Sequence, residues 1–257
     1  MICSVTGPAQ RQEFDRRIAG RPYFEATMGT HCALFGAHPA SGWQFCLLPG
    51  TAALTLRGGT ATVCGSLPEG QEGADAREEL AGFLRFLGVD RLVAERPLCL
   101  PGWQAVEPLL LWELPQGRAL PLPPAPPPEL RLAERPPMQP VSRLVFPESR
   151  DEQDAFYSLA CTALAHGRGC CRALLAGEKP VCTVGSYEQS QTEAYMAAGV
   201  TAPEWRGRGL ASWLIVRLAN ELAAARTARF ACAPALGPFY ECLGFAAAGT
   251  LLQFTRK

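Results

Sequence analysis

Apolar and polar residues follow two periods along this chain, one typical of strands and one typical of helices. In the first half, short apolar stretches are separated by a hairpin turn at Arg57-Gly58-Gly59 and followed by a helical stretch that Gly88 ends. The predicted elements of this half are strands at residues 43–48, 52–56, 60–64 and 91–94 and an amphipathic helix at residues 74–87. We therefore expect an α/β unit here.

The second half repeats this mixture and adds a longer helix. Phe156, Leu159 and Ala163 lie on one face of its first helix, which Gly167 stops. The predicted elements are helices at residues 151–166 and 210–225, strands at residues 170–176, 180–187, 193–200, 230–233 and 246–254, and a short helix that carries Tyr240. The second half is therefore expected to form its own α/β domain.

Proline separates the two halves. Ten of the 23 prolines fall between Pro115 and Pro140, a segment that must be extended and poor in hydrogen bonds. We interpret it as a linker rather than a proline-rich docking ligand, because it lies between two globular halves. The expected organisation is an N-terminal α/β domain at residues 1–114, a linker at residues 115–140 and a second domain at residues 141–257.

A glycine-rich turn connects the strand ending at Val200 to the long helix. Gly207 and Gly209 allow close approach of the main chain to a ligand, and the first N–H groups of the helix have no partner within it. These donors and the helix dipole favour an anion such as a pyrophosphate, to which Arg206 and Arg208 add charge. The spacing completes neither a P-loop nor a Rossmann turn, although a Gly/Arg-rich turn alone also occurs in basic RNA-binding segments.

Two motifs in this order resemble the GNAT N-acetyltransferase superfamily. Arg206-Gly207-Arg208-Gly209-Leu210-Ala211 fits its Arg/Gln-x-x-Gly-x-Gly/Ala signature, and Phe239-Tyr240-Glu241-Cys242-Leu243-Gly244-Phe245 resembles its next motif, a short helix with a tyrosine. The resemblance covers residues 141–257. It implies an α/β (α+β) fold with a mixed, mostly antiparallel sheet flanked by helices. The smaller N-terminal domain resembles a degenerate repeat of the same fold that lacks the glycine turn. We therefore expect it to bind no CoA.

The resemblance implies acetyl-CoA as co-substrate. Its thioester carbonyl would bind main-chain N–H groups on the strand before the turn, and its pyrophosphate would bind the turn itself. The residues expected to bind it are Ala198, Gly199, Val200, Arg206, Gly207, Arg208, Gly209, Leu210, Ala211 and Ser212.

The resemblance also proposes an acid and a base. Tyr240 occupies the position of the tyrosine that protonates the departing CoA sulfur in many members, although it could instead only pack the short helix. Glu193 begins the strand before the turn, as the glutamate base does in histone-type members, with a solvated strand-end residue as the alternative. Members often carry an asparagine after the fifth strand, but residues 230–238 contain none.

Composition narrows the remaining classes. The net charge is zero, which argues against a general nucleic-acid binder. No apolar stretch is long enough for a membrane helix, and the N-terminus, with Gln10, Arg11, Glu13 and Asp15 close behind Met1, lacks the apolar core of a signal peptide. The eleven cysteines are scattered without a Cys-x-x-Cys pair, so we expect free thiols and no metal site, with Cys170-Cys171 as a minor redox candidate. A cytoplasmic protein is expected.

Two function classes remain from the sequence. The first is an N-acetyltransferase acting on a primary amine of a small molecule or a peptide, with the N-terminal half lining the acceptor site or forming a homodimer face. The second is a CoA-binding pseudoenzyme or sensor in which the turn binds CoA but no acetyl group is transferred. The sequence does not identify the acceptor amine.

Overall fold

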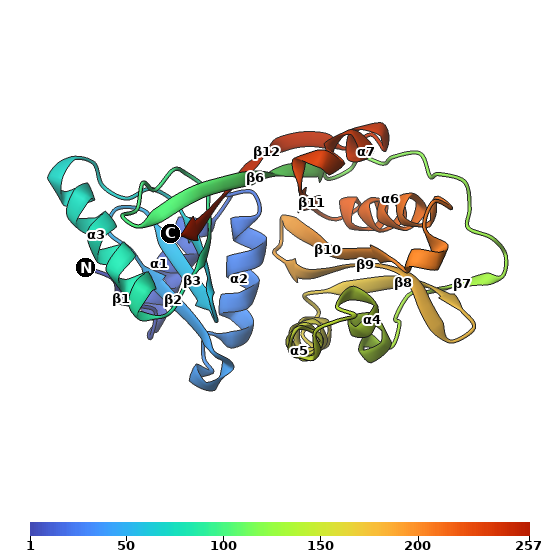
Figure 1. Ribbon diagram of the computed structural model, residues 1–257, viewed down its shortest axis with the longest axis horizontal. Coiled ribbons are helices and arrows are strands. Elements are labelled where there is room, and N and C mark those ends of the chain that lie inside the picture. Colours follow the sequence, from blue (N-terminus) through green and yellow to red (C-terminus); the bar gives the residue numbers. More distant parts are fainter. The chain divides into compact units, whose positions relative to one another are not determined.

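The computed structural model describes the backbone of residues 1–257 and every side chain except that of Pro39. It divides the chain into two compact units (Figure 1). Unit 1 comprises Met1–Leu111, Ala231–Gly237 and Ala248–Lys257, and unit 2 comprises Trp112–Phe230 and Pro238–Ala247. Three strands contribute residues to both units: β6 (Trp103–Leu114), β11 (Thr227–Cys232) and β12 (Ala246–Arg256).

Unit 1 is a sheet with helices on both faces. Its strands are ordered β1-β2-β3-β4-β5-β12, and of these neighbours only β4 and β5 are parallel. The strands are β1 (Cys3–Ser4), β2 (Trp43–Leu47), β3 (Ala53–Arg57), β4 (Thr60–Cys64) and β5 (Arg91–Ala94). The helices are α1 (Pro8–Ile18), α2 (Phe24–Phe35) and α3 (Gly70–Phe86), with a 3₁₀ turn at Pro39–Ser41.

Alternating side chains of these strands build two apolar clusters in unit 1. Leu54 of β3 packs in one cluster with Leu84 of α3. Its neighbour Ala53 packs in the other cluster with Phe14 of α1 and Phe24 of α2. Because adjacent residues of a strand point to opposite faces, α3 covers one face of the sheet and α1 and α2 cover the other.

Unit 2 has the same layering. Its strands are ordered β11-β10-β9-β8-β7, and only β10 and β11 run parallel. Helix α6 covers one face of β8–β10, and α4 and α5 cover the other (Figure 1). The strands are β7 (Leu130–Ala133), β8 (Cys170–Ala176), β9 (Lys179–Gln189) and β10 (Glu193–Thr201). The helices are α4 (Met138–Val145), α5 (Arg150–Ala165), α6 (Leu210–Ala223) and α7 (Gly237–Cys242), with 3₁₀ turns at Pro203–Trp205 and Pro234–Leu236.

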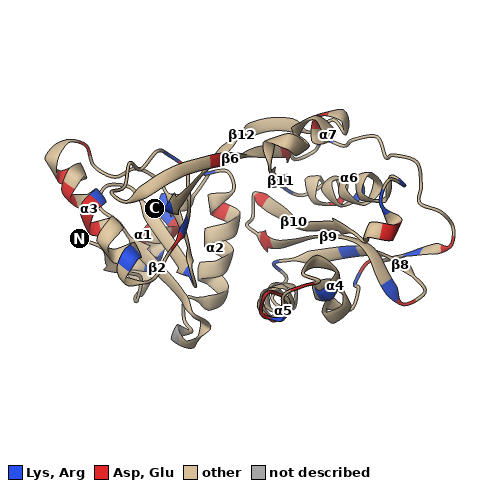
Figure 2. Cartoon of the chain, in the orientation of Figure 1, with Lys and Arg blue, Asp and Glu red and all other residues tan. Residues whose placement is uncertain are grey.

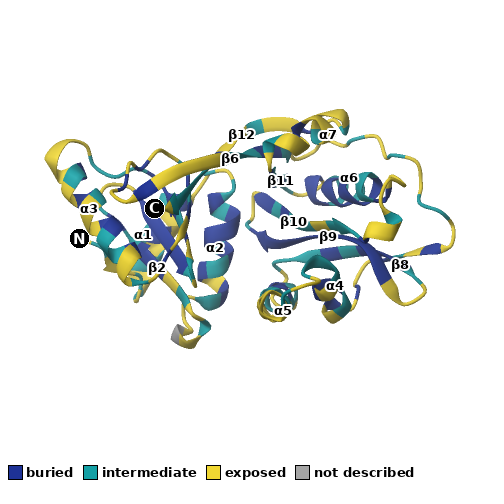
Figure 3. Cartoon of the chain, viewed as in Figure 1, coloured by how far each residue is buried: buried dark blue, intermediate teal, exposed yellow. Residues whose placement is uncertain are grey.

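Helix α6 is the most buried helix of unit 2 (Figure 3). Leu214, Val216 and Leu218 are fully inaccessible to solvent. Burying one such side chain contributes about 1.5–3 kcal/mol, so the helix is held firmly on the sheet. The turn that precedes α6 is positioned by this packing.

The structure confirms the predicted fold class and the predicted elements of both halves, with end shifts of a few residues. It differs inside the predicted linker, where β7 and the start of α4 are regular. β7 pairs with β8 from Ala133 opposite Ala173 to Leu130 opposite Ala176. Pro140 is tolerated because it lies in the first turn of α4, where N–H groups have no helical partner.

The division into units also places the chain end differently from the predicted domain limits. Residues 231–237 and 248–257, expected in the second domain, group with unit 1, because β12 pairs with β5 from Leu252 opposite Ala94 to Thr255 opposite Arg91. The limits 1–114 and 141–257 stay a prediction.

Charge is distributed rather than concentrated. Lysine and arginine residues are interspersed with aspartate and glutamate over both units (Figure 2). None of the described helices combines the length and the apolar character that crossing a bilayer requires.

Candidate functional site

Strand β10 is irregular at the residues that were predicted to face the thioester. Ala197 pairs with Gly185 and Val200 pairs with Thr183, so Ala198 and Gly199 together lie opposite one residue of β9. Ala198 has a φ of 56°, a left-handed conformation that costs a residue with a Cβ about 1–2 kcal/mol. Bulges of this kind redirect main-chain groups out of the ladder, and they are frequent beside active sites.

Strands β10 and β11 part beside this bulge. They pair in parallel from Glu193 opposite Thr227 to Tyr195 opposite Arg229, and the next pair, Met196 with Phe230, does not form. Main-chain N–H and C=O groups of β10 beyond Tyr195 therefore have no ladder partner on the β11 side. The bulge and the end of the pairing coincide, which gathers free main-chain donors at one place in unit 2.

The predicted phosphate-binding turn is exposed and conformationally specialised. Arg206, Gly207, Arg208 and Gly209 are all exposed, and the two glycines have φ values of 74° and 73°. A Cβ added to either glycine would meet nothing within 4 Å, so the space beside them is open. Glycine is therefore favoured at both positions by the left-handed φ and not by a lack of space for a side chain.

Helix α6 begins directly after this turn. Gly209 is the N-cap and supplies no side-chain cap, and the first helical bond runs from the Trp213 N–H to the Gly209 carbonyl. The N–H groups of Leu210, Ala211 and Ser212 are therefore available to an anion at the positive end of a 14-residue helix.

The two arginines of the turn are partly engaged in bracing it. Arg206 Nε donates to the Thr201 carbonyl at 3.1 Å, and Arg208 Nη2 donates to the Glu204 carbonyl at 3.3 Å. The Arg208 guanidinium also stacks 4.7 Å from the centroid of the Trp205 ring. Each guanidinium keeps further N–H donors, so both can hold the loop and still contact an anion.

Tyr240 lies beside the point where β10 and β11 part. Its ring centroid is 4.4 Å from that of Phe230, the first residue of β11 beyond the pairing, and 5.0 Å from that of Phe239. Tyr240 is half-buried. The structure thus places Tyr240 at the end of the β10–β11 pairing, where β10 continues toward its bulge at Ala198 and Gly199.

Glu193 has a different environment. Its carboxylate forms an ion pair with Arg229, which also pairs with Glu113 at 2.7 Å, and only 3% of the Glu193 side chain is exposed. Ala198 lies five positions further along the strand, about 17 Å away at 3.3 Å per residue. The alternative of a solvated strand-end residue is therefore wrong, and the role of Glu193 as a base stays a prediction. Sequence reasoning missed Arg229 and Glu113, because nothing in the spacing marks a pairing between distant strands.

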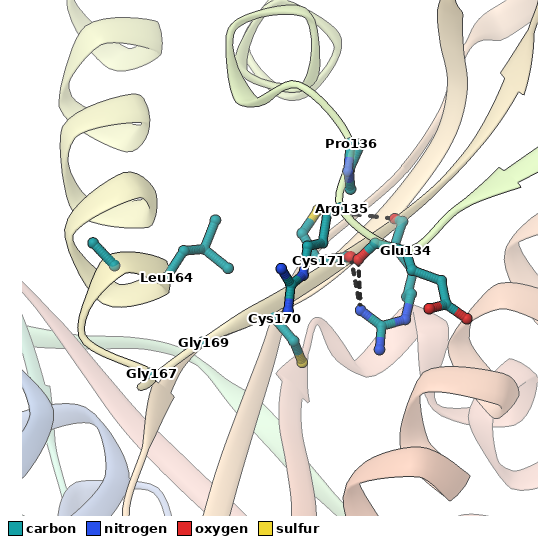
Figure 4. A pocket seen from close by; sticks show the side chains of 10 residues that line it. Glu134, Arg135, Pro136, Leu164, Gly167, Gly169, Cys170 and Cys171 are labelled. Atoms are coloured by element: carbon teal, nitrogen blue, oxygen red, sulfur yellow. Dashed lines mark hydrogen bonds between the residues drawn. The ribbon is translucent and has the colours of Figure 1, made fainter.

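A cavity of about 550 Å³ lies elsewhere in unit 2, at the edge of β8. Figure 4 shows it between the end of α5 at Leu164, the segment Glu134–Pro136 and the start of β8. Arg172 closes part of this edge by donating to the Glu134 and Cys171 carbonyls at 2.8 and 3.0 Å. None of the ten residues that line the cavity was predicted to bind acetyl-CoA.

Cys170 and Cys171, the redox candidate of the sequence, lie at the edge of this cavity. The sulfur atoms of Cys170 and Cys171 lie on opposite sides of β8 (Figure 4), as strand alternation requires. Cys171 Sγ is 3.6 Å from Thr183 Oγ1, whereas Cys170 Sγ accepts from Gln189 Nε2 at 3.6 Å. Burial raises the pKa of both thiols. Neither geometry nor ionisation favours a redox pair here.

Unit 1 contains the same order of strand, turn, helix and strand, but its turn is already satisfied. β4 and β5 pair without interruption to Val63 opposite Ala94, and the Glu95 N–H then bonds the Val63 carbonyl. The Glu95 carboxylate accepts from the Gly65 N–H at 2.8 Å and pairs with Arg21 at 2.7 Å. The Glu95 carboxylate thus occupies the Gly65 N–H at the end of β4, and the absence of CoA binding in this half stays a prediction.

Comparison with known proteins finds a family profile that matches part of the second half. Residues 132–245 match the sequence profile described as "Acetyltransferase (GNAT) family". No curated protein sequence matches the chain.

Solved structures share the fold over the whole chain. The chain is similar to a "tandem GNAT protein from the clavulanic acid biosynthesis pathway", with 17% identity, coverage of 99% of this chain and 97% of that one, and a TM-score of 0.66. It is also similar to a GCN5-related N-acetyltransferase from Sphaerobacter thermophilus, with 13% identity, coverage of 99% and 94%, and a TM-score of 0.63. A GNAT-family acetyltransferase from Colwellia psychrerythraea has 12% identity, covers 100% of both chains and gives a TM-score of 0.60.

Proposed function

We propose that the chain transfers the acetyl group of acetyl-CoA to a primary amine of a small molecule or peptide, because residues 132–245 match the profile of the GNAT acetyltransferase family. One observation carries the proposal: the exposed turn at Gly207 and Gly209 begins α6 next to the place where β10 and β11 part. This arrangement supplies donors for a phosphate and, close by, donors for a carbonyl oxygen.

The turn fits the pyrophosphate of acetyl-CoA. Two left-handed glycines leave open space beside the main chain, and the first N–H groups of α6 point out of the helix end. Arg206 and Arg208 add two positive charges at the rim. Acetyl-CoA supplies an activated acyl group, and the turn holds it in place so that the reaction with the amine becomes effectively unimolecular.

The bulge at Ala198 and Gly199 is our candidate for stabilising the oxyanion. A main-chain N–H released from the ladder can donate to the carbonyl oxygen as negative charge develops there. Loss of one such donor in other enzymes costs about 2.7–4 kcal/mol of transition-state stabilisation. The strained φ of Ala198 is consistent with a main chain held in this orientation by its surroundings.

Tyr240 is our candidate for the general acid. A phenol has an ordinary pKa of about 10 and a thiol one of about 8.5, so a tyrosine can donate a proton to a departing thiolate. Its ring is fixed against Phe230 at the end of the β10–β11 pairing. The hydroxyl proton would pass to the CoA sulfur, and water would restore it.

Glu193 remains our candidate base, with a constraint that the structure adds. Its carboxylate is bonded to Arg229 and lies about 17 Å along β10 from Ala198, so it could accept the amine proton only through intervening water. The ion pair also supports a positioning role, in which Glu193 holds β10 beside β11. An enzyme that relies on water alone as the base is compatible with this arrangement.

A CoA-binding pseudoenzyme or sensor is the second candidate. It is favoured by residues 230–238, which supply no asparagine, and by the engagement of Glu193 with Arg229. A homodimer and a cytoplasmic location are further parts of the proposal. The eleven free thiols of the described chain support a reducing compartment.

The test measures CoA binding by calorimetry and thiol release from acetyl-CoA with a panel of amines. We expect turnover by the wild type and a loss of about 10²-fold or more in kcat for Tyr240→Phe, with CoA affinity unchanged. Phe239→Leu, next to Tyr240 and exposed, is the matched control and should retain activity. Binding of CoA without turnover on any amine would favour the sensor, and an absence of CoA binding would overturn both.

A glutamine at position 193 separates a base from a positioning residue. If Glu193 is the base, Glu193→Gln lowers kcat and removes the acidic limb of the pH–rate profile while CoA affinity is unchanged. If it only positions β10, the substitution lowers thermal stability and CoA affinity together and leaves the pH profile in place.

A further inference from the structure

A second cavity, of about 370 Å³, lies next to the phosphate-binding turn within unit 2. We call it the proline cavity, because its walls include Pro140 and Leu144 of α4, Pro180 at the start of β9 and Pro203 after β10. Its rim carries the charged residues Arg143, Lys179 and Glu204. No residue of this cavity was predicted from the sequence to bind a ligand.

The cavity and the turn are close along the chain. Glu204 lines the cavity and stands three residues before Gly207, so the two are separated by at most about 11 Å of extended chain. They are also joined by contacts, because Arg208 donates to the Glu204 carbonyl and Lys179 pairs with the Glu204 carboxylate at 3.5 Å. A ligand anchored in the turn can therefore extend into the cavity.

The charge of the rim favours an anion. Arg143 is exposed and has no ion-pair partner among the side chains that the structure describes. Lys179 forms an ion pair with Glu204, the one carboxylate of the rim. Two cations against one anion leave a net positive rim, to which Arg206 and Arg208 of the adjacent turn add. An ammonium group such as that of an amine acceptor would be repelled here.

The walls favour a flat apolar group. Proline rings and a leucine side chain are apolar and carry no hydrogen-bond donors, and a proline ring can pack against the face of a planar group. Small-molecule pockets are typically apolar with a few polar groups, and volumes of about 300–1,000 Å³ are usual for them. The proline cavity thus combines an apolar interior with a cationic rim.

We propose that the proline cavity binds the 3′-phosphoadenosine end of CoA, with adenine against the prolines and the 3′-phosphate between Arg143 and Lys179. The inference rests on the proposed function, since it takes the pyrophosphate to be held by the turn. In CoA the ribose joins the pyrophosphate, the adenine and the 3′-phosphate, so a molecule held at its pyrophosphate carries both remaining groups to the neighbouring surface. The chain would thereby bind the 3′-phosphate, a group that CoA has and ADP lacks.

The test compares CoA with 3′-dephospho-CoA on the full chain by calorimetry. The ratio of the two dissociation constants isolates the 3′-phosphate, because the pyrophosphate and pantetheine contacts cancel. We expect the wild type to prefer CoA by roughly tenfold and Arg143→Ala to reduce that preference roughly threefold or more, with dephospho-CoA affinity unchanged. The preference should shrink as salt concentration rises.

Two further variants give changes of predictable sign. Glu204→Gln removes the carboxylate that pairs with Lys179, so the preference for CoA over dephospho-CoA should increase. Arg150→Ala is the matched control, because Arg150 is an exposed arginine of unit 2 that pairs with Asp154 and does not line the cavity. Its preference should equal that of the wild type.

The outcomes separate this inference from the proposed function. If CoA binds but the wild type and Arg143→Ala show the same ratio, the proline cavity does not hold the 3′-phosphate and the proposed function stands. If an anionic acceptor, rather than CoA, loses affinity in Arg143→Ala, the cavity belongs to the acceptor and the inference is overturned. If neither CoA nor dephospho-CoA binds the wild type, the proposed function falls with it.

Discussion

Arg229 of β11 and Glu193 of β10 form a buried ion pair across the short stretch in which these two parallel strands are joined. The side chain of Arg229 is 17% exposed and that of Glu193 is 3% exposed. Arg229 also forms an ion pair with Glu113 at 2.7 Å. Beyond this stretch the strands part and the candidate site begins. The pair therefore fixes the point from which β10 and β11 diverge.

Removing the guanidinium of Arg229 should lower the free energy of unfolding. Arg229→Met leaves the Glu193 carboxylate buried without its partner, and loss of one member of a buried pair typically destabilises by about 3–5 kcal/mol. Urea unfolding measures the change in free energy of unfolding. Arg150→Met is the matched control, because its exposed pair with Asp154 contributes about 0–1 kcal/mol. Equal stabilities of the two variants would show that the Arg229–Glu193 pair does not hold the strands.

A glycine inside β9 is required by its neighbour on the same face. A Cβ added at Gly185 would lie 2.5 Å from Cζ of Tyr187, which is 1% exposed and packed against Phe156. We expect Gly185→Ala to destabilise the protein by about 1–3 kcal/mol through overpacking. Thermal unfolding measures it.

The matched control is Gly82 in the middle of α3. A Cβ there meets nothing within 4 Å, and alanine has the higher helix propensity, so Gly82→Ala should stabilise by about 0.4–1 kcal/mol. The two alanines thus shift the melting temperature in opposite directions. A stabilising Gly185→Ala would mean that Tyr187 can leave its position without loss.

The thiols should react in two classes. Cys3, Cys99 and Cys242 are exposed, whereas Cys32, Cys46 and Cys182 are buried, and burial raises the pKa of the last three to about 12, 11 and 11. At pH 8 we expect rapid alkylation of the three exposed thiols by iodoacetamide, identified by mass spectrometry, and slow alkylation of the buried ones. The denatured chain is the control, in which all eleven should react. Rapid native labelling of Cys46 or Cys182 would contradict this environment.

The same shifts give stability a pH dependence. Burial raises the folded-state pKa of Cys46 and of Cys182 to about 11, above that of the same thiols in the unfolded chain, so an unfolded chain releases these protons first. Their contribution is complete below about pH 9 and decreases as the pH rises toward 11, by at most about 1.4 kcal/mol per pH unit for each thiol. Cys46→Ala should flatten this part of the stability curve.

One CoA molecule should bind per chain. In unit 1 the Glu95 carboxylate already accepts from the Gly65 N–H and pairs with Arg21, and β4 and β5 stay joined through Ala94. Calorimetry should therefore give a stoichiometry near one. Glu95→Gln should lower stability by about 1–3 kcal/mol, because Arg21 loses its charged partner, and should leave the stoichiometry unchanged. Two equivalents of CoA on the wild type would contradict an occupied first turn.

Local patterns predicted much of the fold and the phosphate-binding turn. The apolar period placed α6 at its observed start, and the glycines before it marked a turn in which both adopt left-handed φ values. Such features depend on residues within a few positions of one another. They can be read from one stretch of chain without knowledge of the rest.

Features that depend on distant pairing were not predictable in this way. The proline-rich segment hides β7, which becomes a strand only because the edge of β8 is available to it. The environment of Glu193 depends on Arg229, 36 residues away, and on Glu113, further still. The bulge at Ala198 requires the register between β10 and β9, which no single-strand pattern contains.

The last strand has a consequence for how the protein is made. Residues 248–257 belong to unit 1, where β12 pairs with β5, so the first unit lacks a sheet strand until these residues have left the ribosome. Synthesis proceeds from the N-terminus, and N-terminal domains usually fold first. Here the order of folding is inverted in part, because β7–β10 and α6 can assemble while β5 still has an unpaired edge. A nascent chain arrested before residue 248 should therefore protect the second unit from protease better than the first.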